Sequence, residues 1–171
     1  SVGVETPASP ISGRAGWWKS PSPDLVRVSG GPQIRLGPPG TTRQFLSEKE
    51  TAALVAAPDS ATWIGRRDRT LLLVAVQTGL RNAELRSLRR RDVNVGVGAH
   101  LRCFGKGRKT RCTPLRRDVA AVLEVWLVEL GAGADAPVFP SSRGGFLSSD
   151  ALQSLVGRHT AAARETCPSL A

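Results

Sequence analysis

The sequence is first informative for what it lacks: its 171 residues include no tyrosine, no methionine, three cysteines and 5% aromatic residues. Without tyrosine, no residue of this sequence can serve as a tyrosine nucleophile. The absence of methionine leads us to expect a chain that has lost its initiator or is a fragment. Three cysteines with no C-x-x-C pair do not suggest a disulfide framework, so we expect free thiols.

Long apolar runs are also missing. The longest, from Leu71 to Val76, is too short to span a bilayer, and no signal-peptide pattern opens the chain. We therefore expect a cytoplasmic protein with no membrane partner. A zinc site built from His100, Cys103 and Cys112 is disfavoured because this spacing matches no known ligand pattern. We expect no metal and no cofactor.

The length suits one hydrophobic core, so we expect one domain with a tail. Residues 1–40 hold seven of the twelve prolines and seven glycines, and they show neither helical nor strand periodicity. This composition predicts a disordered or extended tail over residues 1–40. The folded domain is then expected over residues 41–171.

The net charge of +10 is confined to one part of the chain. Between Arg81 and Arg117 there are twelve basic residues and two acidic ones, Glu84 and Asp92, whereas basic and acidic residues cancel elsewhere. The overall charge predicts a polyanionic binding partner, either nucleic acid or an anionic membrane. Because surfaces usually mix charges of both signs, this segment is interpreted as a surface that faces phosphates.

Local patterns predict a mainly helical α+β protein. Ser47 and Glu50 form a capping-box pattern, and Gly79 is a helix-stop signal. Periodicity predicts helices over residues 48–57, 62–77, 81–90 and 117–130, and a last helix beginning near Ser148 or Ser149. The runs HLRCF (100–104) and RCTPL (111–115) flank GKGRKT, which predicts a small β-hairpin.

The third predicted helix carries two sets of polar side chains. Residues 81, 84, 85 and 88 share one helical stripe, so Arg81 and Glu84 are expected to point inward with apolar neighbours. A buried arginine needs a partner, which Glu84 can provide. Two interpretations stay open: the pair only ties helices together, or Glu84 braces a guanidinium that binds a phosphate. Arg86, Arg89 and Arg90 point elsewhere and are candidate phosphate contacts.

The predicted hairpin carries a second cluster of positive charge. Lys106 lies between Gly105 and Gly107, and such glycines allow close approach to a ligand. Further basic residues in the same stretch are Arg108, Lys109 and Arg111. The cluster is either a solvated basic turn or a DNA-binding element.

Several of these segments resemble one protein family. TGLRNAEL (78–85), the following Leu88 and Asp92, and GKGRKTRCTPL (105–115) are similar to the catalytic domain of tyrosine recombinases, or phage integrases, including Xer-like members. FLSEKE and VFPSSRGG also resemble that domain. The resemblance covers about residues 43–171 and implies the N-terminal part of an integrase-like catalytic domain, with a small β-hairpin or three-stranded sheet.

The resemblance also implies a mechanism on double-stranded DNA. Arg81 would bind the scissile phosphate and stabilise its pentacoordinate transition state, and Glu84 would orient that arginine. Lys106 would enter the minor groove and protonate the leaving 5′-hydroxyl. The intact family integrates and recombines DNA through a 3′-phosphotyrosyl intermediate, without a metal, and self-association on DNA is expected.

The family pattern is incomplete here. It also requires an H-x-x-R box, a further His or Trp, and the tyrosine, yet Leu155 stands three residues before Arg158 where histidine is required. We therefore expect a fragment that binds DNA but does not cleave it alone. We also expect the apolar face around Leu71 to Val76 and Leu85 to lack cover.

An alternative interpretation explains the positive charge without a catalytic role. A non-catalytic basic module for DNA or RNA would use Arg86, Arg89, Arg90 and the hairpin only as phosphate contacts. This alternative predicts that Arg81 contributes no more to binding than Arg90 does.

Overall fold

The computed structural model describes residues 46–104, 110–131 and 133–170. The tail predicted for residues 1–40, and the domain start at residue 41, lie outside these residues. The described elements are α1 (Glu48–Ala56), α2 (Trp63–Thr78), α3 (Asn82–Ser87), the 3-10 helix η2 (Arg90–Asp92), β1 (Val93–Asn94), β2 (His100–Phe104), β3 (Thr110–Pro114), α4 (Arg117–Leu130) and α5 (Ser149–Thr166).

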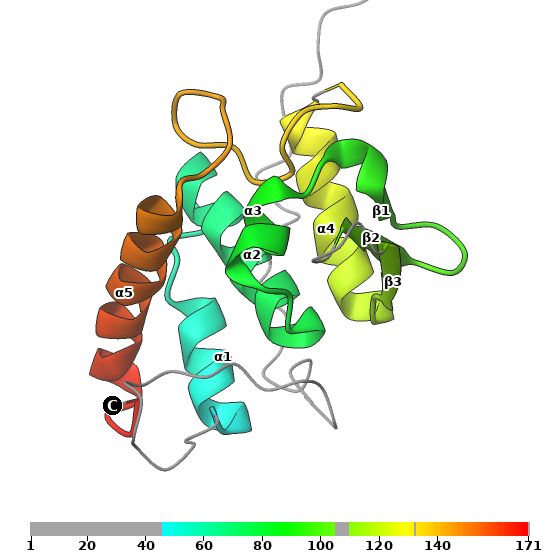
Figure 1. The fold of residues 1–171 in the computed structure, drawn as a ribbon. Helices are drawn as coiled ribbons and strands as arrows, with labels where there is room; N and C mark the ends of the chain where they lie inside the picture. Colours follow the sequence, from blue (N-terminus) through cyan, green and yellow to red (C-terminus); the bar gives the residue numbers. More distant parts are fainter. Residues whose placement is uncertain (1–45, 105–109, 132, 171) are drawn as a thin grey trace, which may run out of the picture.

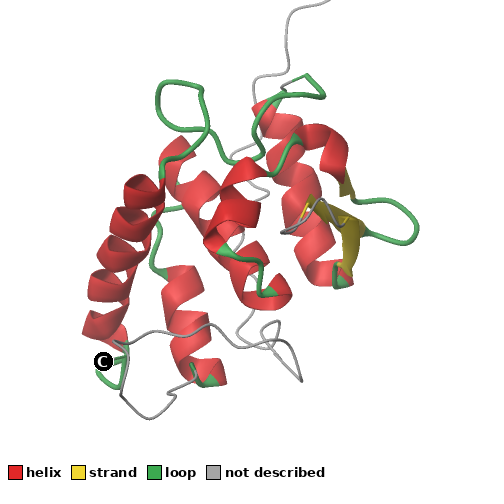
Figure 2. Ribbon diagram, viewed as in Figure 1, coloured by secondary structure: helices red, strands yellow, loops and turns green. Residues whose placement is uncertain are grey.

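The predicted mainly helical α+β class is confirmed, and the small sheet has three antiparallel strands in the order β1-β2-β3 (Figure 2). Leu101 on β2 pairs with Val93 on β1 and with Thr113 on β3. Helix α1 packs against α5 and α2, while α4 covers the other side of α2, next to the sheet (Figure 1). In the described residues, no helix has both the length and the apolar character needed to cross a membrane.

The ends of α1 and α2 follow the local signals in the sequence. The Ser47 hydroxyl accepts the Glu50 backbone N–H at 3.2 Å, and the Glu50 carboxylate accepts the Ser47 backbone N–H at 2.8 Å. Gly79 ends α2 with a φ of 60°, a left-handed conformation that suits glycine. Both predicted caps are therefore confirmed.

The helix predicted over residues 81–90 is wrong in its extent, because α3 is only six residues long. After α3, Leu88 is extended and its carbonyl accepts the Val138 N–H at 2.9 Å. The Arg90 N–H donates to the Ala136 carbonyl at 3.0 Å. The backbone here pairs with residues 134–138 instead of continuing the helix, since those partners satisfy the same polar groups.

One core joins the helices and the sheet. Leu71 on α2 is 1% exposed and Leu85 on α3 is 4% exposed, and they belong to the same cluster as Leu101, Leu123 and Trp126. The expectation that the face around Leu71 to Val76 and Leu85 would lack cover is therefore wrong. Elements of this chain bury it.

A buried charge cluster holds α5 and the segment 137–140 against α2. The Arg67 guanidinium donates to Asp68 Oδ1 at 2.8 and 2.6 Å and to the Pro140 carbonyl at 2.7 Å. The other carboxylate oxygen, Asp68 Oδ2, lies 2.8 Å from His159 Nε2 on α5. Arg158 Nη2, on a largely exposed side chain, lies 3.9 Å from Asp68 Oδ2.

Candidate functional site

Glu84 is the centre of a small charged site that joins the start of α3 to β3. Its Oε2 atom accepts the Arg81 backbone N–H at 2.9 Å, and Oε1 lies 3.3 Å from Arg81 Nη1. Arg111 on β3 donates from Nη2 to Glu84 Oε2 at 2.9 Å. A single carboxylate thus holds two arginines, of which Arg111 lies 27 positions after Glu84 in the sequence.

Arg81 does not point inward, which corrects the prediction from helical spacing. It precedes α3 in an extended conformation, with φ of −64° and ψ of 153°, so it is not on the helical stripe of Leu85. Its side chain is 74% exposed, whereas that of Glu84 is 5% exposed. The buried carboxylate therefore braces an arginine whose guanidinium an external anion can reach.

The environment of Glu84 favours its charged form. Burial raises its pKa, but the Arg81 backbone N–H and the positive charges of Arg111 and Arg81 together hold the pKa of Glu84 below its usual 4.5. Because the folded-state pKa is the lower one, Glu84 contributes stability above the unfolded value, and this is lost as pH falls through the folded value.

The variant Glu84→Gln is therefore expected to be less stable than the natural chain at pH 7, by about 1.5–3 kcal/mol for hydrogen bonds to a charged group. The difference should shrink below pH 4.5, where the natural carboxylate also becomes neutral. Urea unfolding at pH 7 and in the acid range measures both. Glu124→Gln, at an exposed position on α4, is the control. A deficit that does not change with pH would contradict the assignment.

Two of the other predicted phosphate contacts have partners inside the protein. The Arg86 side chain donates from Nε to Asn82 Oδ1 at 2.7 Å and from Nη1 to the Leu147 carbonyl at 3.0 Å. Arg89 donates from Nη1 to the Asp135 carbonyl at 2.8 Å. Arg90 is half-buried on η2. The predicted residues Lys106, Arg108 and Lys109 lie outside the described residues.

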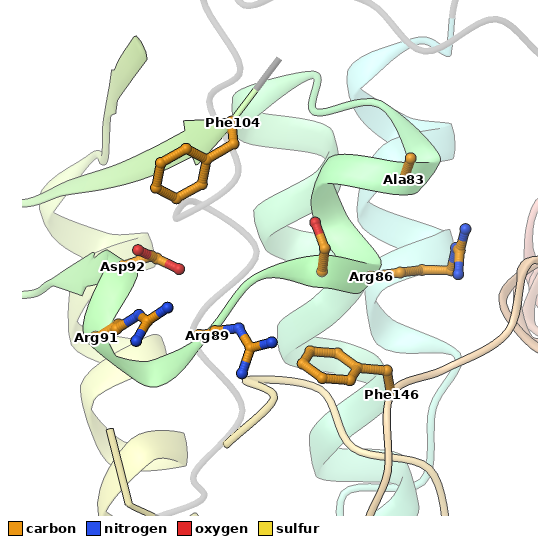
Figure 3. A pocket seen from close by; sticks show the side chains of 8 residues that line it. Ala83, Arg86, Arg89, Arg91, Asp92, Phe104 and Phe146 are labelled. Carbon is orange, nitrogen blue, oxygen red and sulfur yellow. The ribbon is translucent and has the colours of Figure 1, made fainter. Parts of the chain in front are cut away.

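A cleft of about 580 Å³ opens beside α3 (Figure 3). Its walls include Arg86, Ser87, Arg89, Arg91, Phe104 and Phe146. Sequence reasoning proposed Arg86 and Arg89 as DNA contacts but did not connect them with either phenylalanine. The two rings come from β2 and from the loop before α5, and no local pattern brings these segments together.

The cysteines do not form a common site. The strand register pairs Cys103 with Arg111 and Arg102 with Cys112, so Cys103 and Cys112 lie on opposite faces of the hairpin. Burial and the negative charge of Glu84 raise the pKa of the Cys103 thiol. A zinc site that includes both Cys103 and Cys112 is incompatible with this register.

The chain is similar in sequence to known proteins of one family. Residues 44–166 match the model described as "Phage integrase family". The protein y4rC of Sinorhizobium fredii, named as an integrase/recombinase, is 50% identical over 130 residues, which cover 76% of this chain and 39% of that protein. The tyrosine recombinase XerC of Xanthomonas axonopodis pv. citri is 39% identical over 130 residues, 74% of this chain and 42% of its own length.

Solved structures show the same fold. The crystal structure of XerA recombinase has a TM-score of 0.61 at 22% identity and covers 72% of this chain and 44% of its own. XerH, a site-specific recombinase bound to its difH substrate, has a TM-score of 0.59 at 25% identity and covers 69% of this chain and 36% of its own. The chain thus spans about two fifths of the length of the relatives it matches.

Proposed function

This chain belongs to the phage integrase family of tyrosine recombinases, and on that premise we propose that it binds double-stranded DNA for site-specific recombination. The observation that supports this most directly is the exposed Arg81 braced by the buried Glu84. A planar guanidinium fixed in this way suits a phosphate diester, because its remaining N–H groups can bind two oxygens at once.

The proposed division of roles follows the family resemblance. Arg81 contacts the scissile phosphate and stabilises the charge that develops on it, and Glu84 keeps Arg81 in position. Lys106, which lies between β2 and β3 in the sequence, donates the proton to the leaving 5′-hydroxyl. The 171 residues contain no tyrosine, so the nucleophile of that reaction is not among them. Self-association on DNA belongs to the same proposal for the whole protein.

Charge supports DNA as the partner. The segment from residue 81 to residue 117 carries the whole net charge of +10, and it includes Arg81, η2 and the strands of the sheet. Basic surfaces of this kind bind polyphosphates through counterion release. XerH, which shares the fold, is a site-specific recombinase bound to its difH substrate.

Measurements of duplex DNA binding on two alanine variants separate this proposal from the non-catalytic alternative. Arg81→Ala is expected to weaken affinity about tenfold, or about 1.4 kcal/mol, since it removes a positioned phosphate contact. Arg90→Ala, at a half-buried position on η2, should weaken it about two- to threefold. Fluorescence anisotropy at fixed salt gives both values. Equal losses would favour the basic module without catalytic geometry.

A further inference from the structure

The cleft beside α3 has exposed aromatic rings on its walls. Phe104, at the end of β2, is 58% exposed and Phe146 is 42% exposed. Figure 3 shows Phe104 above Asp92 and Arg91, with Phe146 on the far side of Arg89. Aromatic rings left open to solvent in a concave site commonly mark a place where a ligand stacks.

The same cleft is positively charged. Among the described residues that line it, Arg86, Arg89 and Arg91 are basic, and the one acidic residue, Asp92, is bound by Arg102 at 3.1 Å. Asp135 forms ion pairs with Arg91 and Arg89 close by. More basic than acidic groups surround the cavity, so an anionic ligand is favoured.

Each of the two phenylalanines has an arginine guanidinium over its ring, and that of Arg102 lies 5.9 Å from the centre of the Phe104 ring. The Arg89 guanidinium carbon lies 5.0 Å from the centre of the Phe146 ring, and its Nη1 atom donates to the Asp135 carbonyl. Phe146 therefore holds Arg89 in place by a cation–π contact. Phe104 is the more exposed ring, and it is the wall on which a flat ligand can stack.

This combination fits a nucleotide. Aromatic faces bind the π-face of a base, and neighbouring arginines bind its phosphate. A volume of 580 Å³ lies within the range of about 300–1,000 Å³ typical of small-ligand sites. In a duplex the base faces are covered by stacking, so only an unpaired nucleotide offers its face to Phe104.

We propose that the cleft binds an unpaired nucleotide of the DNA, with its base stacked on Phe104 and its phosphate held by Arg89 and Arg91. The inference rests on the proposed function, since the cleft includes Ala83 and Ser87 of the helix that follows Arg81. A nucleotide displaced from the duplex is thus captured beside the helix that follows Arg81.

The test compares three DNA probes on the full chain: a paired duplex, the same duplex with one bulged 2-aminopurine, and a short single strand. The bulged duplex is expected to bind about tenfold tighter than the paired one, within the range for one stacked base. Stacking should also quench the 2-aminopurine fluorescence. Phe104→Leu is expected to abolish both the preference and the quenching while paired-duplex affinity stays unchanged. Phe104→Trp should keep both.

Val97→Ala, at a fully exposed position between β1 and β2, is the matched surface control and should change none of these values. Equal thermal midpoints for the variants show that folding is intact. An undiminished preference in Phe104→Leu would overturn the stacking proposal.

The outcomes also separate this inference from the function on which it rests. A chain that binds paired duplex with no preference for the bulge refutes the inference alone. Binding of single strand without duplex refutes the proposed function alone, and binding of neither refutes both. If an acidic phenylalanine-containing peptide binds the cleft while the bulge is not preferred, the occupant is a peptide and the nucleotide proposal is wrong.

Discussion

Asp68→Ala is expected to lower the free energy of unfolding by about 3–5 kcal/mol, the cost of leaving a buried charge without its partner. Asp68 is 0% exposed and Arg67 is 5% exposed, so solvent cannot replace the missing carboxylate. His159 on α5 loses its contact with Asp68 Oδ2 at the same time. Urea unfolding at pH 7 measures the change.

Two further variants show whether the lost charge causes this effect. The double variant Arg67→Met with Asp68→Leu removes both charges and should recover much of the stability, because apolar replacements of a buried ion pair are often neutral. Arg158→Ala, at a side chain 64% exposed and 3.9 Å from the carboxylate, should cost less than about 0.5 kcal/mol. A loss below about 1 kcal/mol for Asp68→Ala would contradict a critical role for the buried pair.

Much of the framework could be predicted because its signals are local. The capping pair Ser47 and Glu50 lies within four residues, and Gly79 directly follows the last turn of α2. The hairpin strands also follow from short runs around glycines. Such features depend only on residues that are close in the sequence, so they can be predicted without knowledge of the fold.

The candidate site was only partly predictable. The pairing of Arg81 with Glu84 was expected, but helical spacing placed Arg81 inward because it assumed that the helix included residue 81. In the structure Glu84 reaches back to the backbone N–H of Arg81, which therefore precedes the helix. Arg111 was predicted only as a DNA contact, because its hydrogen bond with Glu84 forms only once the hairpin has folded.

The contacts that sequence reasoning missed join distant segments. Asp68 and His159 are 91 positions apart in the sequence. The cleft residues Phe104 and Phe146 come before and after α4 in the sequence, at the end of β2 and in the loop before α5. No periodicity or motif spans such distances. A partial signal for the buried cluster was present, because Arg67 and Asp68 stand side by side in a helix that is otherwise apolar toward its C-terminal end.

Trp126→Ala is expected to cost about 3–5 kcal/mol, as large-to-small substitutions of buried aromatics do. Trp126 on α4 is 0% exposed, and its ring centre lies 5.3 Å from that of Trp63 on α2 with an interplanar angle of 53°. Its indole N–H also donates to the Val138 carbonyl at 2.8 Å. The change is measured by urea unfolding, and a loss below about 1 kcal/mol would contradict the packing described.

Trp126→Phe separates the hydrogen bond from the packing. It keeps most of the apolar volume but leaves the Val138 carbonyl without the indole donor, for an expected loss of about 1–3 kcal/mol. The segment 137–140 is then held mainly by the Arg67 bond to Pro140 and the Val138 N–H bond to Leu88. Because this segment leads to Phe146, which orients Arg89, a folded Trp126→Phe chain should also bind the bulged duplex less tightly. Weaker binding of the bulged duplex with unchanged affinity for the paired duplex would locate the effect in the cleft, where Phe146 contacts Arg89.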